Sequence, residues 1–306
     1  MNQPSTIEEV GAFVREKGAP CLVRGKGTKS SLCHTGDERD VLDLSRLSGV
    51  VEYEPSEYVF TAKAGTTLVE INETLLQNNH YLPFDPPLAE KGATLGGTVA
   101  SGLSGPGMFR YGGIRDFIIG VRFAIGSGKI VKGGGKVVKN AAGFDYPKFL
   151  VGSLGCLAVL LELTFKVFPH PEARVTLRLD SKNLGEALAK LLLCSRSKWD
   201  VEALELESDG PLFLRLAGEP TGLQSRAEVI LSELGKGTVL SDEQADDYWR
   251  NISNFTWAGS ESTYAKVPIS PRIIPKLDSA LNGIAIERRY GVGGNVAWLA
   301  WSNHAV

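Results

Sequence analysis

The sequence predicts an α+β protein with two domains, and three observations lead to this prediction. Short apolar strand patterns alternate with amphipathic helix patterns along all 306 residues. Of the 35 glycines, 24 lie at or before Gly155, and 17 of these fall between Gly92 and Gly155. After Pro171 the order becomes strand, helix, strand, strand, helix, strand, which is typical of a ferredoxin-like domain. We therefore expect a glycine-rich domain over residues 1–170 and a smaller domain over residues 171–306.

In the first domain, capping signals and alternating patterns define the elements. Thr6 and Glu9 form a capping-box pattern before an apolar stripe, and Thr67 with Glu70 opens a second helix. Strands are expected at residues 20–23, 41–44, 49–53, 58–64 and 157–168. Between Gly92 and Gly155 the only convincing regular elements are strands at 120–124 and 129–131.

In the second domain, the predicted strands are 174–179, 201–206, 212–217 and 238–240, with helices at 184–193 and 223–234. Ser241 and the Ser270-Pro271 pair have the pattern of two further helix starts. Strands at 284–290 and 295–301 close the domain. The prolines at 169 and 171 mark the boundary between the two domains.

The charge balance argues against a nucleic-acid-binding protein. The 33 Lys and Arg residues nearly balance the 35 Asp and Glu residues, giving a net charge of −2, whereas phosphate neutralisation needs a basic stripe. The longest apolar run, residues 156–161, is too short to span a bilayer. Because the N-terminus has no basic-then-apolar signal pattern, we expect a cytoplasmic protein.

The cysteines and histidines show no metal-ligand spacing. There is no C-x-x-C, H-x-H or H-E-x-x-H pattern, so neither an iron–sulfur cluster, a zinc site nor a histidine-rich metal centre is expected within this chain. Reduced thiols are the expected state. The residues concerned are Cys21, Cys33, Cys156, Cys194, His34, His80, His170 and His304.

The loop at residues 24–30, RGKGTKS, is the first candidate binding segment. It nearly matches the Rossmann G-x-G-x-x-G pattern, and Asp43 lies about where the ribose-binding acid would stand. Residues 30–40, however, show no helical stripe, which a Rossmann unit requires. The alternatives are a nest of backbone N–H groups that grips a diphosphate and an ordinary surface turn.

Two further segments combine glycine with small Thr, Ser and Ala residues. They cover residues 92–116 and residues 139–159. Glycines this dense cost chain entropy, and they make sense where the backbone must pass close to a large flat ligand. The alternative is a disordered glycine loop, against which the interleaved apolar and aromatic residues argue.

These segments resemble the FAD-binding domain of the p-cresol methylhydroxylase / vanillyl-alcohol oxidase superfamily, over about residues 1–170. The 24–30 loop is similar to its first FAD pyrophosphate loop, and residues 53–68 to its strand–Gly-Thr–helix element. Within the superfamily, three strings resemble the FAD-binding subunits E of glycolate oxidase complexes: ATLGGTVASGLSGP (93–106), IRDF (114–117) and VKNAAGFDY (138–146), the last leading into LVGSLGCLAV (150–159).

The resemblance implies a two-subdomain PCMH-type FAD-binding domain over 1–170 and a ferredoxin-like cap over 171–306. It implies that FAD is the cofactor. Because the 24–30 loop holds no histidine, and His34 lies beyond it, we expect the flavin to be bound non-covalently. Leu154 and Ala158 depart from the acidic residue and the glycine that many superfamily members carry there. The implied cofactor-binding residues are Arg24, Gly25, Lys26, Gly27, Thr28, Lys29, Ser30, Pro87, Thr94, Gly96, Gly97, Ala100, Ser101, Gly102, Tyr111, Gly112, Arg115, Asp116, Asn140, Gly143, Gly155 and Val159.

The resemblance also implies a function: a subunit of a glycolate (2-hydroxy acid) oxidase or dehydrogenase complex. It would work beside a related catalytic FAD-oxidase subunit and pass electrons to an iron–sulfur subunit, in the cytoplasm or attached to the inner membrane through the complex. We assign no catalytic residue and no metal ligand, since no histidine lies between His170 and His304. The second-domain arginines are expected to be surface or structural cations rather than substrate clamps: Arg215, Arg250, Arg272, Arg288 and Arg289.

Two other interpretations stay open at this point. One is a self-sufficient FAD-dependent oxidase or dehydrogenase of another small alcohol or hydroxy acid. The other is a scaffold that keeps the fold and has lost the flavin.

Overall fold

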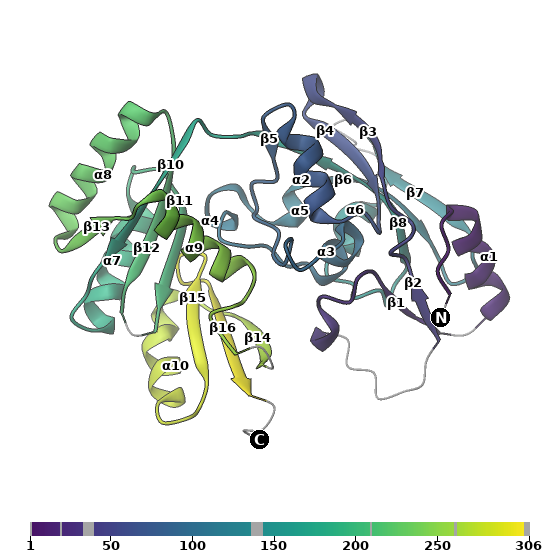
Figure 1. The fold of residues 1–306 in the computed structure, drawn as a ribbon. Coiled ribbons are helices and arrows are strands. Elements are labelled where there is room, and N and C mark those ends of the chain that lie inside the picture. Colours follow the sequence, from purple (N-terminus) through teal and green to yellow (C-terminus); the bar gives the residue numbers. More distant parts are fainter. Residues whose placement is uncertain are drawn as a thin grey trace. The chain divides into compact units, whose positions relative to one another are not determined.

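The computed structural model describes residues 2–18, 20–32, 40–135, 143–208, 210–259 and 262–302. The chain forms two compact units (Figure 1). Unit 1 consists of Met1–Ser104 and Gly113–His170, and unit 2 of Gly105–Gly112 and Pro171–Val306. The sequence predicts Gly105–Gly112 as part of the first domain, whereas these residues group with unit 2 in the structure. Phe109 packs against the apolar core of unit 2, and this burial draws the segment into that unit.

Unit 1 is built on a five-stranded antiparallel sheet in the order β3-β4-β8-β6-β7. The strands are β3 (Val50–Glu54), β4 (Val59–Lys63), β6 (Ile118–Ala124), β7 (Ile130–Gly134) and β8 (Val159–Lys166). The central strand β8 is buried at six of its eight positions. This burial on both faces explains its nearly continuous apolar sequence.

Smaller elements surround this sheet. Both predicted caps are confirmed, because Thr6 accepts a hydrogen bond from the Glu9 amide and Thr67 accepts one from the Glu70 amide. These caps open α1 (Ile7–Lys17) and α2 (Leu68–Leu76). The other elements are the parallel pair β1 (Leu22–Arg24) and β2 (Val41–Asp43), the antiparallel pair β5 (His80–Tyr81) and β9 (Phe168–Pro169), and the short 3-10 turns Ser30–Leu32 and Pro55–Glu57.

The glycine-rich stretch is more regular than its sequence predicts. It contains the short helices α3 (Leu95–Ser101), α4 (Met108–Tyr111), α5 (Ile114–Phe117) and α6 (Tyr146–Leu150). In α3, Thr94 caps the N-terminus, and Gly102 ends the helix in the left-handed region at φ 65°. Tertiary contacts overcome the low helix propensity of glycine, because the Gly96 amide donates to the Ala64 carbonyl at 2.8 Å.

Unit 2 contains a seven-stranded antiparallel sheet in the order β13-β10-β12-β11-β15-β16-β14. Strands β13, β10, β12 and β11 lie side by side, and with the helices α7 and α8 they are connected as in a ferredoxin-like unit. The elements are β10 (Ala173–Leu179), α7 (Leu184–Arg196), β11 (Val201–Glu207), β12 (Leu212–Gly218), α8 (Pro220–Leu234), β13 (Gly237–Val239), α9 (Asp242–Ser253), β14 (Ser262–Pro268), the 3-10 turn Pro271–Ile273, α10 (Ile274–Leu281), β15 (Glu287–Gly291) and β16 (Val296–Ser302).

The two faces of the unit 2 sheet carry different chemistry. One face forms the apolar core with residues of α7, α8 and α10 (Figure 1). On the other face, Trp249 of α9 donates from Nε1 to Thr176 Oγ1 at 2.9 Å. The sequence analysis did not predict the edge strand β14. Most of its residues are half-buried, and among the described strands it pairs with β16. Among the described residues, no helix is long and apolar enough to cross a membrane.

Candidate functional site

Unit 1 contains a cavity of about 200 Å³ between the 24–30 loop and helix α3. All seven residues of the loop line it, together with Thr94, Gly97, Ala100 and Ser101. These eleven residues are all among those expected to bind the cofactor. The structure therefore brings together two segments that are separated by about 65 residues of sequence.

The 24–30 loop follows β1 and is held by its contacts with α3. A Cβ atom at Gly25 would lie 2.3 Å from Thr94 Oγ1, so only glycine lets the loop approach the cap of α3. A short 3-10 turn follows the loop at Ser30–Leu32. Asp43, which lies where a Rossmann acid would stand in the sequence, is engaged within the protein. Its carboxylate accepts hydrogen bonds from the Ser45 amide at 2.9 Å and from Gln3 at 3.3 Å.

Lys29 supplies an unpaired positive charge in the lining of this cavity. Its Nζ is buried and has no hydrogen-bond partner among the described residues. Burial lowers the pKa of Lys29 to about 8, because the charged form has lost its hydration. A buried ammonium group without a partner is costly, and an anion bound in the cavity would relieve that cost.

Helix α3 contributes one of its faces to the cavity. Thr94, Gly97, Ala100 and Ser101 recur at helical spacing, which places them on a common side. The Ala100 carbonyl accepts the Leu154 amide at 2.8 Å. This bond brings Leu154, which has a positive φ of 51°, to the edge of the cavity.

A second cavity of about 680 Å³ adjoins the first in unit 1. The two share Leu22, Val23, Leu32 and Leu154 in their linings. Gly155 and Val159, two expected cofactor-binding residues, line the second cavity. Two adjoining cavities, one of them with the Lys29 ammonium in its lining, fit an elongated dinucleotide that carries a diphosphate.

Several expected residues lie outside both linings. Gly96 packs against Ala64, Gly102 ends α3, and Asp116 accepts the Gly113 amide at 2.8 Å at the start of α5. These three shape the backbone near the cavity. Pro87, Arg115 and Gly143 also lie outside the linings, Tyr111 and Gly112 belong to unit 2, and Asn140 falls outside the described residues.

The sequence did not single out the apolar walls of the cavities. Leu22, Val23, Leu32 and Leu154 were missing from the expected site. Leu22 and Val23 belong to strand β1, which leads directly into the 24–30 loop. Their position next to the loop in the sequence could have identified them as cavity residues. No group of three or more metal-ligating side chains occurs in the part of the chain that the structure describes.

The neighbouring glycines of α3 have separable roles, and a pair of substitutions tests this. A Cβ at Gly96 would lie 2.7 Å from the Ala64 Cβ, so Gly96→Ala is expected to lower the unfolding free energy by about 1–3 kcal/mol. At Gly97 a Cβ would meet only Thr94 Oγ1, at 3.1 Å, so Gly97→Ala is expected to cost less than about 1 kcal/mol. Denaturant unfolding measures both, and equal losses would contradict the assignment.

Comparison with known proteins identifies the family of this chain. A family model described as an FAD binding domain matches residues 2–134. The chain is 34% identical to the glycolate oxidase subunit GlcE of Escherichia coli strain K12 over 300 residues, covering 96% of this chain and 79% of that subunit. It is 30% identical to a D-lactate dehydrogenase of Archaeoglobus fulgidus over 189 residues, which are 61% of this chain but only 42% of that enzyme.

Solved structures of known proteins share the fold of this chain. A crystal structure of p-cresol methylhydroxylase superposes with a TM-score of 0.73 at 12% identity, covering 98% of this chain and 74% of that one. The expected PCMH-type FAD-binding fold and the expected cofactor, FAD, are confirmed. The chain belongs to the FAD-binding family of the glycolate oxidase subunit GlcE.

Proposed function

We propose that this chain is an FAD-binding subunit of a glycolate (2-hydroxy acid) oxidase or dehydrogenase complex. The observation that carries the proposal is the cavity between the 24–30 loop and α3. Its lining includes the Lys29 ammonium, which has no hydrogen-bond partner within the described part of the chain, and the chain is a relative of GlcE. The backbone N–H groups and Lys29 would hold the diphosphate of FAD, without a covalent bond to the protein. Bound FAD supplies hydride and electron transfer.

The side chains of unit 2 suggest that the chain does not oxidise the substrate alone. A hydroxy-acid dehydrogenase needs a base for the hydroxyl proton and a cation for the carboxylate. Arg215 and Arg289 are buried rather than at the surface, and both are engaged, with Glu202 and with Glu207 and Tyr248 respectively. Burial raises the pKa of Tyr248 well above its ordinary value, so its phenol stays protonated and cannot take up the hydroxyl proton.

This division of roles requires two partners. A related catalytic FAD-oxidase subunit would oxidise the 2-hydroxy acid, and an iron–sulfur subunit would accept the electrons. The word "subunit" in the name of the E. coli relative supports a complex. As part of this proposal, the chain lies in the cytoplasm or is attached to the inner membrane through the complex.

Purification from the native cell tests the proposal. We expect the isolated chain to be yellow, and glycolate to bleach its flavin band near about 450 nm only when the partner subunits are present. Co-purification of a second flavoprotein and an iron–sulfur protein is the expected companion result. A clean monomer that turns over glycolate at the full rate would overturn the proposal.

The second candidate function is a self-sufficient FAD-dependent dehydrogenase of another small hydroxy acid or alcohol. The identity with the D-lactate dehydrogenase favours it, although the chain spans less than half of that enzyme. A substrate other than glycolate that bleaches the flavin of the isolated chain would support this candidate. A colourless, flavin-free protein after gentle purification would instead support a scaffold subunit.

A further inference from the structure

The sheet of unit 2 turns charged and aromatic side chains away from its apolar core. Ala297, Tyr290 and Leu206 belong to that core, and they pair with one another across β16, β15 and β11. Because successive side chains of a strand point to opposite faces, the residues adjacent to these three lie on the other face of the sheet. One row of that other face, crossing β14, β16, β15 and β11, consists of Lys266, Trp298, Arg289 and Glu207.

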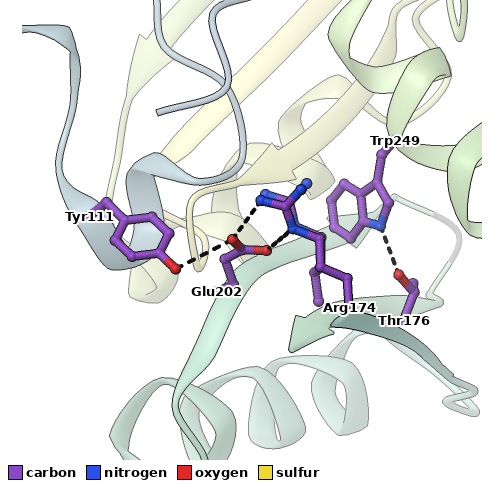
Figure 2. Close-up of polar contacts among 6 residues, drawn as sticks. Tyr111, Arg174, Thr176, Glu202 and Trp249 are labelled. Carbon is purple, nitrogen blue, oxygen red and sulfur yellow. Dashed lines mark hydrogen bonds and ion pairs between the residues drawn. The ribbon is translucent and has the colours of Figure 1, made fainter. Parts of the chain in front are cut away.

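A second cluster of charges in unit 2 shows how buried charges are satisfied there. Glu202 is fully buried, and Arg174 donates to both of its oxygens at 3.0 Å. Arg215 donates to Oε2 at 2.5 Å, and its guanidinium lies 4.8 Å from the centre of the Trp249 ring. Figure 2 shows Glu202 between Tyr111 and Arg174, with Trp249 beside them. In this cluster the carboxylate and the guanidinium groups neutralise one another.

Lys266 differs from this pattern, because its ammonium has no opposite charge against it. Within the part of the chain that the structure describes, its Nζ makes no ion pair and no hydrogen bond, and it lies 5.9 Å from the centre of the Trp298 ring. Burial lowers the pKa of Lys266, since the ammonium has lost part of its hydration. A negatively charged ligand against Lys266 would restore the lost stabilisation.

Arg289, in the same row, keeps one hydrogen-bond donor unused. Its side chain is only 7% exposed, and its Nη2 reaches Glu207 at 3.1 Å and the Tyr248 hydroxyl at 2.7 Å. Its Nε is buried and has no hydrogen-bond partner among the described residues. A buried N–H group without an acceptor is destabilising, so an acceptor bound beside Arg289 is favoured.

One cluster of aromatic rings connects the two cations. The Lys266 ammonium lies over the Trp298 ring. The Arg289 guanidinium lies 5.8 Å from the centre of the Trp257 ring. Phe255 contacts both indoles, with ring centres 4.8 Å from Trp298 and 6.5 Å from Trp257. These rings exclude water from the surroundings of both cations, which strengthens their attraction for an anion.

We infer that Lys266 and the Nε of Arg289 together form a binding site for a small monocarboxylate. Their strands are separated by β16 alone, a backbone distance of about 10 Å. The Lys266 side chain and one carboxylate group together span this distance. The ammonium then pairs with the carboxylate, and the Arg289 Nε–H donates to one of its oxygens. The inference concerns unit 2 and does not depend on the proposed FAD site.

Acidic side chains near Arg289 favour a ligand with a single negative charge. Glu207 pairs with Arg289, and the Tyr248 hydroxyl accepts a hydrogen bond from it. Burial is the main cause of the raised pKa of Tyr248, and the charges of Glu205 and Glu207 add to it. A dianion such as phosphate would be repelled by these carboxylates, whereas the single charge of a monocarboxylate is neutralised by one ammonium.

Titration of the purified full-length chain with acetate tests the inference. Acetate carries the carboxylate but no hydroxyl that a flavin could oxidise, so the result does not depend on any activity. Because Trp257 and Trp298 lie beside the two cations, we expect a saturable change in tryptophan fluorescence. The uncharged analogue acetamide is expected to bind at least about tenfold more weakly, the loss of one charged hydrogen bond. Phosphate is also expected to bind more weakly than acetate.

Lys266→Met has a matched control in Lys276→Met. Lys276 is an exposed lysine of α10 in the same unit. We expect Lys266→Met to raise the Kd for acetate at least about tenfold and Lys276→Met to leave it within about twofold. If Lys266→Met does not fold, the comparison of acetate with acetamide on the wild-type chain still decides the matter.

Four results would overturn the inference: no saturable change with acetate, equal binding of acetate and acetamide, tighter binding of phosphate than of acetate, or a Lys266→Met protein that binds acetate like the wild type. A chain that binds acetate but no FAD would contradict the proposed function and leave this site standing. A chain that binds FAD but no acetate would overturn the site alone.

Discussion

Replacing Lys29 by methionine is expected to raise the Kd for FAD about 10- to 100-fold, without lowering the stability of the flavin-free protein. The lost interaction is a hydrogen bond between an ammonium and a phosphate, which is worth about 1.5–3 kcal/mol. In the flavin-free protein the Lys29 Nζ is buried without a hydrogen-bond partner among the described residues, so a methyl group in its place removes a buried charge. The substitution is therefore expected to weaken FAD binding while it removes a destabilising buried charge from the flavin-free protein.

Isothermal titration with FAD and thermal unfolding of the flavin-free protein measure the two quantities. Lys26→Met is the matched control, because Lys26 belongs to the same loop but is exposed. We expect Lys26→Met to change the Kd less than tenfold, since exposed charges interact weakly. A Lys29→Met protein that binds FAD like the wild type would show that Lys29 does not hold the diphosphate.

The pH dependence of FAD binding gives an independent check on Lys29. Its pKa of about 8 lies below the ordinary value of 10.5, so above pH 8 the side chain is largely neutral in the flavin-free protein. Pairing with a diphosphate then requires uptake of a proton, and the affinity is expected to fall by up to about tenfold per pH unit above pH 8. In Lys29→Met this dependence should be absent. A wild-type affinity that is constant from pH 7 to pH 9 would contradict the prediction.

Glu202→Gln is expected to lower the unfolding free energy of unit 2 by about 3–5 kcal/mol. Its carboxylate is fully buried between Arg174 and Arg215, and neutralising it removes a buried counter-charge from both guanidinium groups. Burial alone would raise the pKa of Glu202, but the two arginines outweigh burial and lower it. Its stabilising contribution is therefore present above its unfolded pKa, and is lost as the pH falls through its lower folded value.

Tryptophan fluorescence during urea unfolding measures this loss, because all five tryptophans lie between residues 199 and 301, in unit 2. Asp200→Asn is the control: its carboxylate also pairs with an arginine, Arg110, but is 61% exposed. We expect the control to cost at most about 1 kcal/mol. Similar losses of unfolding free energy in the two variants would contradict the prediction that burial makes the Glu202 ion pairs contribute more to stability than the exposed Asp200–Arg110 pair.

Patterns of a few neighbouring residues were sufficient for much of this structure. The caps at Thr6, Thr67 and Ser241 depend on contacts within one turn, and the structure contains all three. The 24–30 loop also begins where a short strand ends, as expected. Such features were predictable because the hydrogen bonds and side-chain spacing that produce them lie within a few residues of sequence.

Several features depended on contacts between distant residues. Gly96 is required by Ala64, and Gly25 by Thr94, so many glycines that seemed to make room for a ligand make room for the protein itself. Arg215 and Arg289, expected at the surface or as structural cations, are buried ion-pair partners. Strand β14 takes its conformation from β16 alone.

The sequence by itself determined the FAD-binding family, the cofactor FAD and most of the helices and strands. The tertiary structure decided which residues line the cavities, and it places the Tyr111 hydroxyl within hydrogen-bond distance of Glu202. The physical reason is that local hydrogen bonds and periodic burial are encoded in neighbouring residues. The position of a side chain, and the pKa of a lysine such as Lys29, depend instead on packing between segments far apart in the chain.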